Sequence, residues 1–301
     1  MSIHEKNDFD ISNYDHMAVL MRHPNFNNDW QNSSESFSLT EEDYFYQQND
    51  GFNSLPGLKG ILYAIYISIF FIGICGNVLI CYVVFRNKSM HTVTNFFIAN
   101  LALSNILLCT FAVPFTSIYF FMSKWVFGRV LCHLVPYIEG ASVYITAFTL
   151  MSIAIDRYLV TMYPFKPRLQ LTSCYIIVLA VWILAGLLIL PNGIFMVLVN
   201  TENGIYCDEV WPHESSRKAF AVLTLILQFV IPFIIIIFCY LNVCIDIKKH
   251  ALSMPGAESF EKDEMEREST RRINRMLIIM VIFFYTSWLP FNIYNLTLNL
   301  S

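Results

Sequence analysis

The chain has 301 residues, of which 56% are hydrophobic and only 14% are charged, and its formal net charge is −4. Soluble domains carry about 25% charged residues, so this composition excludes an ordinary soluble domain and indicates an integral membrane protein. We therefore expect an all-α fold, a polytopic membrane helical bundle surrounded by lipid.

The amino-terminal part, residues 1–57, is rich in Asn, Ser, Asp and Glu. Such a segment buries too little apolar surface to fold alone, so we predict a disordered, acidic extracellular tail. An acidic tail attracts cationic ligands, although a plain solvated spacer is an equally good interpretation. Asn32 opens the sequence Asn32-Ser33-Ser34, a glycosylation signal whose use the sequence leaves open.

Residues 58–301 contain six apolar runs, each long enough for a helix of about 20 residues to cross a bilayer. Lys and Arg cluster in the connections after the first, third and fifth runs, which the positive-inside rule places in the cytoplasm. The amino terminus is then extracellular, and we expect a multi-pass protein of the plasma membrane. The predicted spans are residues 58–85, 94–121, 132–158, 172–199, 219–245 and 272–300.

Polar residues and a proline interrupt the second run, and a charged stretch precedes the last. Amides at the depth of Asn100 and Asn105 normally form hydrogen bonds with neighbouring helices. Pro114 is expected to kink the outer half of the second span. The mixed-charge residues 258–275 predict a solvated helix that continues directly into the sixth span.

The third run carries Cys132, Glu139 and Arg157 in that order. At about 1.5 Å per residue, Glu139 lies roughly 10 Å and Arg157 roughly 37 Å from Cys132 along a helix, so they fall within and beyond the membrane core. A carboxylate facing lipid costs at least ~2.5 kcal/mol, so we expect Glu139 to face a wet pocket or a cation. A basic residue of a ligand is the simplest partner, and an internal pair or a protonated structural acid is the alternative.

Of the eight cysteines, only Cys132 and Cys207 lie at or beyond the outer ends of spans. A disulfide between them is chemically reasonable in an oxidising exterior. The chain shows no Ser-His-Asp set, metal-ligand cluster or phosphate-binding loop, so we expect no enzyme activity, no cofactor, no metal and no nucleic-acid partner. A transporter or channel predicts inverted repeats or rows of acids at mid-membrane, and neither is visible.

Several short motifs follow one another in the apolar part of the chain. They are Gly76-Asn77, Leu101-Ala102 followed by Asn105, Cys132, Asp156-Arg157-Tyr158, Trp182, Pro232 with Tyr240, and Ser287-Trp288-Leu289-Pro290. Together they resemble the rhodopsin-like (class A) family of G-protein-coupled receptors. Leu227-Gln228-Phe229 and the segment from Trp288 to Leu296 are most similar to receptors for neuropeptide Y and invertebrate neuropeptide F.

The resemblance implies a receptor that transmits the binding of an extracellular neuropeptide to a heterotrimeric G protein. It implies a pocket between outer helix ends that takes the carboxyl end of a peptide, with ligand-binding residues Glu139, Gln228, Trp288, Asn292 and Asn295. It also implies that a disulfide joins Cys132 to Cys207.

The resemblance further implies an inner cleft that opens to admit the G protein. The coupling residues would be Asp156, Arg157, Tyr158, Phe165 and Tyr240. A switch connecting the pocket to that cleft would consist of Pro232, Phe284, Trp288 and Pro290.

The chain departs from the family pattern at three residues. Asn105 replaces the usual aspartate, which implies a weakened or missing sodium site, and Ala147 replaces a bulkier residue between Pro232 and Phe284. Glu139 stands where neuropeptide Y receptors usually have glutamine and amine receptors have aspartate, so the acid suggests a ligand with a basic residue.

The seventh span of the family is also absent from this sequence, with six spans present of an expected seven. Two alternatives to a neuropeptide receptor stay open. The missing span would fit a truncated, non-signalling isoform that pairs with a full-length receptor, and the acid Glu139 in the third span would also fit a receptor for a biogenic amine.

Overall fold

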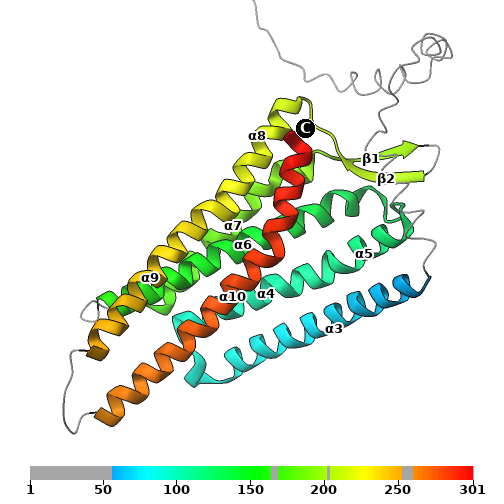
Figure 1. Ribbon diagram of the computed structural model, residues 1–301. Coiled ribbons are helices and arrows are strands. Elements are labelled where there is room, and N and C mark those ends of the chain that lie inside the picture. The colour runs from blue at the N-terminus through cyan, green and yellow to red at the C-terminus, as the bar shows by residue number, and fades with distance from the viewer. Residues whose placement is uncertain (1–55, 164–168, 202–203, 253–259, 301) are drawn as a thin grey trace, which may run out of the picture. The chain divides into compact units, whose positions relative to one another are not determined.

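Helices form nearly all of the chain that the computed structural model describes, namely residues 56–163, 169–201, 204–252 and 260–300 (Figure 1). Asn32, Phe165 and all but the last two residues of the predicted tail lie outside these ranges. The helical elements in chain order are α3 (Pro56–Arg86), η1 (Lys88–Met90), α4 (Val93–Phe111), α5 (Val113–Met122), α6 (Gly128–Met162), α7 (Leu171–Ile194), α8 (Glu214–Leu225), η2 (Ile226–Val230), α9 (Ile231–Leu252) and α10 (Phe260–Leu300).

Six helical segments in the described residues are long and apolar enough to cross a membrane, which confirms the predicted helical membrane bundle. They are Gly57–Arg86, Val93–Met122, Gly128–Met162, Leu171–Ile194, Glu214–Asp246 and Arg271–Thr297. The main difference from the predicted bounds is at the fourth segment. Its helix ends at Ile194 rather than at residue 199, because the apolar residues that follow form a strand.

The second span breaks where a proline follows. α4 ends at Phe111 and α5 begins at Val113, with Ala112 between them and Pro114 in the first turn of α5. Proline has no N–H to donate to the preceding turn and fits best at the start of a helix, so the break follows from the sequence. α10 starts at Phe260 and runs without interruption through the sixth span, which confirms the predicted continuous helix.

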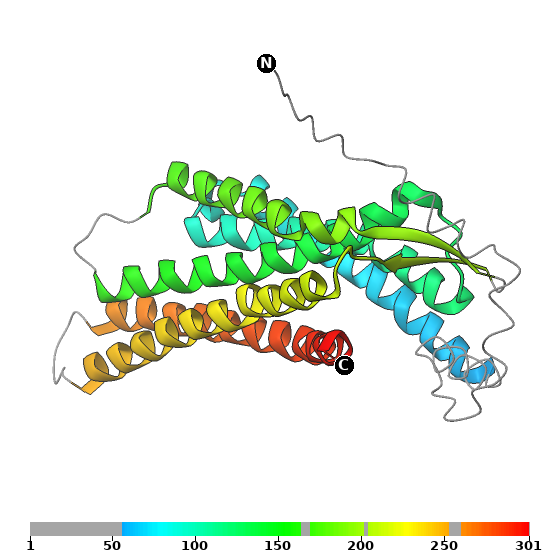
Figure 2. The same cartoon turned by 90° about the horizontal axis from the view of Figure 1, so that it is seen from above.

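α6 is the central helix of the bundle. In the apolar stretch of α6 that could cross a membrane, 56% of the residues are buried, whereas in the corresponding stretch of α3 only 6% are buried. α6 packs against α4, α7 and α9, and Figure 2 shows it between α7 on one side and α9 on the other. Because α6 touches so many elements, residues at its outer, middle and inner levels are fixed relative to the rest of the bundle.

A polar clasp formed by Asn100, Thr149 and Trp182 joins α4, α6 and α7. The Asn100 amide donates to Thr149 Oγ1 at 2.8 Å, and Trp182 Nε1 donates to Asn100 Oδ1 at 2.7 Å. In α3 and α4, Asn105 Nδ2 donates to Asn77 Oδ1 at 3.2 Å. Hydrogen bonding of the mid-membrane amides to neighbouring helices is thus confirmed for Asn100 and Asn105.

A two-stranded antiparallel hairpin of β1 (Met196–Thr201) and β2 (Gly204–Glu209) follows α7, with Leu198 opposite Cys207. The hairpin is tied to the loop before α6, because the Trp125 backbone N–H donates to the Ile205 carbonyl at 2.7 Å. Trp125 is itself buried, and its Nε1 donates to the Gly128 carbonyl at 2.8 Å. The hairpin is therefore held over the outer end of α6.

Candidate functional site

A cavity of about 320 Å³ lies at the outer end of the bundle, between α6, β2, α8, η2 and α10. All five residues predicted to bind ligand line it: Glu139, Gln228, Trp288, Asn292 and Asn295. They come from three segments that are far apart in the sequence, and the helix packing brings them to one space. Their contact with a ligand stays a prediction.

The walls of this cavity carry an excess of negative charge. Glu139, Asp208 and Glu209 contribute carboxylates, and Arg217 is the single basic residue in the lining. Arg217 Nη2 already lies 3.6 Å from Glu214 Oε1, on the exposed side of α8. Among the described residues, Glu139 has no ion-pair partner, so its carboxylate is available to a cation inside the cavity.

The acids of β2 are held by local hydrogen bonds. The backbone N–H of Glu209 donates to Asp208 Oδ1 at 2.8 Å, and Trp211 Nε1 donates to the Glu209 carboxylate. Sequence reasoning missed both acids as lining residues. The available signal was their position directly after Cys207, since a disulfide there brings the following residues to the mouth of the bundle.

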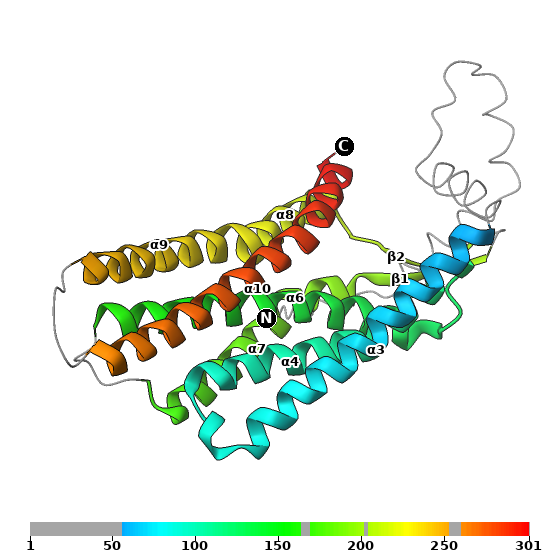
Figure 3. The same ribbon diagram turned by 60° about the horizontal axis from the view of Figure 1, so that its bottom comes forward.

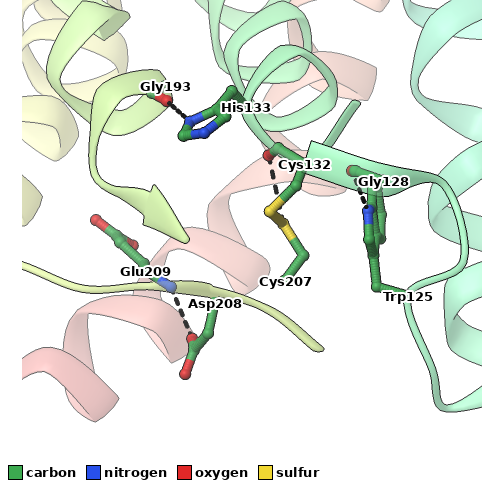
Figure 4. Close-up of a disulfide and its surroundings, with 8 residues drawn as sticks. All are labelled: Trp125, Gly128, Cys132, His133, Gly193, Cys207, Asp208 and Glu209. Atoms are coloured by element: carbon green, nitrogen blue, oxygen red, sulfur yellow. Dashed lines mark hydrogen bonds between the residues drawn. A yellow bond between two sulfur atoms is a disulfide. The ribbon is translucent and has the colours of Figure 1, made fainter. Parts of the chain in front are cut away.

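The Cys132–Cys207 disulfide is present and joins the start of α6 to β2 (Figure 4). Beside it, His133 Nδ1 donates to the Gly193 carbonyl at 2.9 Å and connects α6 to the end of α7. Cys132 is completely buried in a cluster with Trp125 and Met196. The disulfide thus holds the hairpin, with its two acids, at the rim of the cavity.

Gln228 is positioned by a π-helical segment, η2, between α8 and α9. One extra residue in that turn rotates the side chains that follow, and such segments occur often at functional sites. Gln228 is 3% exposed, and its Nε2 donates to the Gly140 carbonyl of α6 at 3.4 Å. This contact places the amide on the floor of the cavity beside Glu139.

Trp288 lies between the outer cavity and a second one of about 430 Å³, because it lines both. One helical turn further inward, the Phe284 ring stacks on Phe229 with their centroids 5.7 Å apart. The neighbouring Tyr285 hydroxyl donates to the Phe229 carbonyl at 3.1 Å. Pro232 is fully buried. Phe284 and Trp288 of the predicted switch therefore belong to one packed cluster, whereas Pro290 is exposed.

The second cavity is lined by residues of α3, α4, α6 and α10. Figure 3 shows α3 and α10 on either side of α4. None of its lining residues is charged, and its polar groups are Asn77, Asn105, Ser142, Thr146 and Ser287. Since Asn105 and Asn77 are neutral and bonded to each other, this site lacks the carboxylate that attracts a sodium ion.

At the inner end of α6, Asp156 and Arg157 form an ion pair with Nη2 and Oδ2 2.6 Å apart. Thr94 of α4 donates to the same Oδ2 at 3.2 Å, and Asp156 is only 2% exposed. Tyr240 of α9 is buried in the core cluster that continues to this level. The buried carboxylate thus binds the guanidinium at the inner end of α6.

Residues 76–301 match the family described as "7 transmembrane receptor (rhodopsin family)". The chain is 33% identical over 273 residues to the RYamide receptor of Tribolium castaneum, covering 86% of this chain and 73% of the relative. It is 37% identical to the RYamide receptor of Drosophila melanogaster (89% and 57%) and 34% identical to human neuropeptide Y receptor type 2 (80% and 64%).

The chain therefore belongs to the rhodopsin-like class of G-protein-coupled receptors, among those related to neuropeptide receptors. This confirms the resemblance inferred from the motifs. The chain spans between 57% and 73% of the length of the three relatives named above, and less than two thirds of two of them.

Proposed function

We propose that this chain is a plasma-membrane receptor, with its amino terminus outside, that binds a neuropeptide carrying a basic residue and passes the signal to a heterotrimeric G protein. The observation that carries the proposal is the outer cavity, in which three carboxylates and four amide side chains surround a space whose single basic side chain already has an acidic neighbour. A guanidinium or ammonium group entering this space gains an opposite charge without displacing an internal ion pair.

Glu139 is the residue we expect to receive the cation. It lies on the central helix, it is partly buried, and no basic residue in the described part of the chain pairs with it. Asp208 and Glu209 at the rim raise the local concentration of a cationic peptide, as like charges on one wall of a cleft do. Gln228, Asn292 and Asn295 offer amide donors and acceptors for the uncharged parts of the ligand.

The relatives favour a peptide over an amine ligand. Those named here are receptors for RYamide and neuropeptide Y, and the name RYamide spells a peptide that ends in Arg, Tyr and an amide. Such an ending supplies a guanidinium for the acidic cavity. On this basis we place the peptide's carboxyl end in the cavity and rank an amine below it.

For transmission of the signal we assign a role to Trp288, because it lines the outer cavity and also packs against the cluster that contains Phe229 and Phe284. The inner pair of Asp156 and Arg157, with Tyr158, Tyr240 and Phe165, is the surface we assign to the G protein. Support for this assignment comes from the ion pair, in which Arg157 is held by a single neighbouring carboxylate and is free to turn when the inner helix ends separate.

The test is a peptide screen on cells that express the receptor from its full coding sequence. Amidated peptides that end in Arg-Tyr are compared with counterparts in which citrulline, a neutral isostere, replaces the arginine. G-protein dissociation by resonance energy transfer is the readout. The proposal predicts activation by the arginine peptides and a marked loss of potency with citrulline. Equal potency of the two series would refute the need for a basic residue in the ligand. No response to any peptide would refute the assignment as a peptide receptor.

A further inference from the structure

A buried amide without any partner lies in the inner half of α10. Asn274 is 6% exposed, and in the described part of the chain neither its Oδ1 nor its Nδ2 has a hydrogen-bond partner. Among the residues that the structure describes, the only other such side-chain atom is the hydroxyl oxygen of Thr224. Buried amides normally form hydrogen bonds, so an exception calls for a reason.

The other buried amides of the bundle follow the rule. Asn100 uses both its oxygen and its nitrogen in the polar clasp, and Gln228 donates to the Gly140 carbonyl. Asn242 of α9, which is not buried, also has a partner, since it donates to the Phe238 carbonyl of its own helix at 2.7 Å. Among the buried amides of the described residues, Asn274 therefore differs from Asn100 and Gln228 in lacking a partner.

Asn274 lies on the face of α10 that packs into the core. Leu277, Val281 and Phe284 follow it at helical spacing, and all three belong to the main buried cluster. At about 1.5 Å per residue, Asn274 is roughly 15 Å inward of Phe284, and Tyr240 is roughly 16 Å inward of Phe229, the ring on which Phe284 stacks. Asn274 is thus level with Tyr240, at the end of the bundle assigned to the G protein.

An apolar side chain at this position would extend the row of buried apolar residues formed by Leu277, Val281 and Phe284, and it would remove the unpaired group. One unsatisfied amide costs enough free energy to change an equilibrium constant about ten-fold. Asn274 therefore lowers, by about that factor, the equilibrium constant for packing the inner end of α10 against the bundle. In an arrangement with this end moved away from α6 and α9, the amide faces the cleft and is hydrated. A group that disfavours one of two arrangements shifts their populations by the same factor.

We propose that Asn274 sets the resting activity of the receptor: its unpaired amide raises the population in which the inner end of α10 is separated from the bundle and the G-protein surface is accessible. The proposal rests on the proposed function for its link to signalling. The population shift itself depends only on the burial of the amide and the absence of a partner for it.

The test replaces the amide with an apolar side chain of similar size in Asn274→Leu, with Asn274→Met as a second variant in case the branched side chain packs poorly. Asn242→Leu is the matched control, because it makes the same chemical change at a neighbouring helix where the amide is paired. Receptors are expressed from the full coding sequence, and ligand-independent G-protein activation is measured relative to surface expression. We expect resting activity to fall about ten-fold in both Asn274 variants and to stay unchanged in the control.

Two further measurements do not need a G protein. Spin labels at Arg275 and His91, both exposed at the inner side, report the separation of α10 and α4 in the purified receptor after the exposed cysteines Cys75 and Cys244 are replaced by serine. We expect the long-distance population to shrink and the midpoint of thermal unfolding to rise in the Asn274 variants alone.

Unchanged resting activity with an unchanged distance distribution would overturn the proposal, as would a lower unfolding midpoint in both Asn274 variants. If the unmodified receptor activates no G protein at all, the proposed function fails. The distances and the unfolding midpoint then still decide whether Asn274 controls the position of α10.

Discussion

Substitution of Glu139 by glutamine tests the acidic cavity directly. Gln keeps the length of the side chain and one acceptor oxygen, so Glu139→Gln removes the charge and little else. Hydrogen bonds to a charged group contribute about 1.5 to 3 kcal/mol, and we take about 2 kcal/mol because Asp208 and Glu209 remain in the lining and the site is only partly buried. This corresponds to a roughly thirty-fold loss of affinity for a peptide with a basic residue.

The assay is competition binding on membranes, with surface expression measured on the same cells. Glu214→Gln is the matched control, since it makes the same change at an exposed acid outside the cavity that pairs with Arg217 across 3.6 Å. Exposed pairs contribute little, so this control should leave binding unchanged.

A citrulline peptide completes the cycle. If Glu139 binds the arginine, the citrulline peptide should lose affinity for the unmodified receptor, and Glu139→Gln should then cause little further loss. An equal thirty-fold effect of Glu139→Gln on both peptides would refute a direct charge interaction, and an unchanged affinity for the arginine peptide would refute the role of Glu139 altogether.

Two other substitutions test the inner end and the core. Arg157→Ala should abolish G-protein activation while peptide binding on the same membranes stays measurable, and intact coupling would contradict the assignment of this surface. Arg157→Lys keeps a positive charge near the buried Asp156, so it separates loss of coupling from the cost of an unpaired acid. Asn100→Leu leaves the indole N–H of Trp182 without its acceptor and Thr149 without its donor. We therefore expect it to lower the free energy of unfolding by about 2 to 4 kcal/mol, which a thermal-shift assay detects as a lower unfolding midpoint. A stability equal to that of the unmodified receptor would show that the polar clasp contributes nothing.

Much of the fold was predictable because a bilayer leaves a chain few choices. Backbone groups in lipid need internal hydrogen bonds, so long apolar runs become helices, and the runs themselves are visible in the sequence. The hairpin was not predicted, since the apolar residues from Met196 onward look like a continuation of the fourth span. Only their pairing with β2 makes them a strand, and a short apolar run does not by itself distinguish a strand from the end of a helix.

The site was predictable where a single residue would be energetically unfavourable in lipid. Glu139 stands out in any apolar run, whereas the placement of Gln228 depends on the π-helical turn of η2, which adds a residue without a sequence signal. Asn292 and Asn295 were assigned by resemblance, and helix packing brings them to the cavity. Asn274 was missed because a polar residue near the membrane boundary is ordinary, and its lack of a partner appears only once the helices are packed.

The polar clasp also has a consequence for how the protein is made. A chain emerging from the ribosome inserts α4 before α6 and α6 before α7, so the oxygen of Asn100 lacks the indole of Trp182 until the fourth membrane segment arrives. Until then the nascent protein has an unsatisfied amide within the bilayer. The hydrogen bond from Trp182 therefore favours association of α7 with α4 and α6 once the fourth membrane segment has inserted.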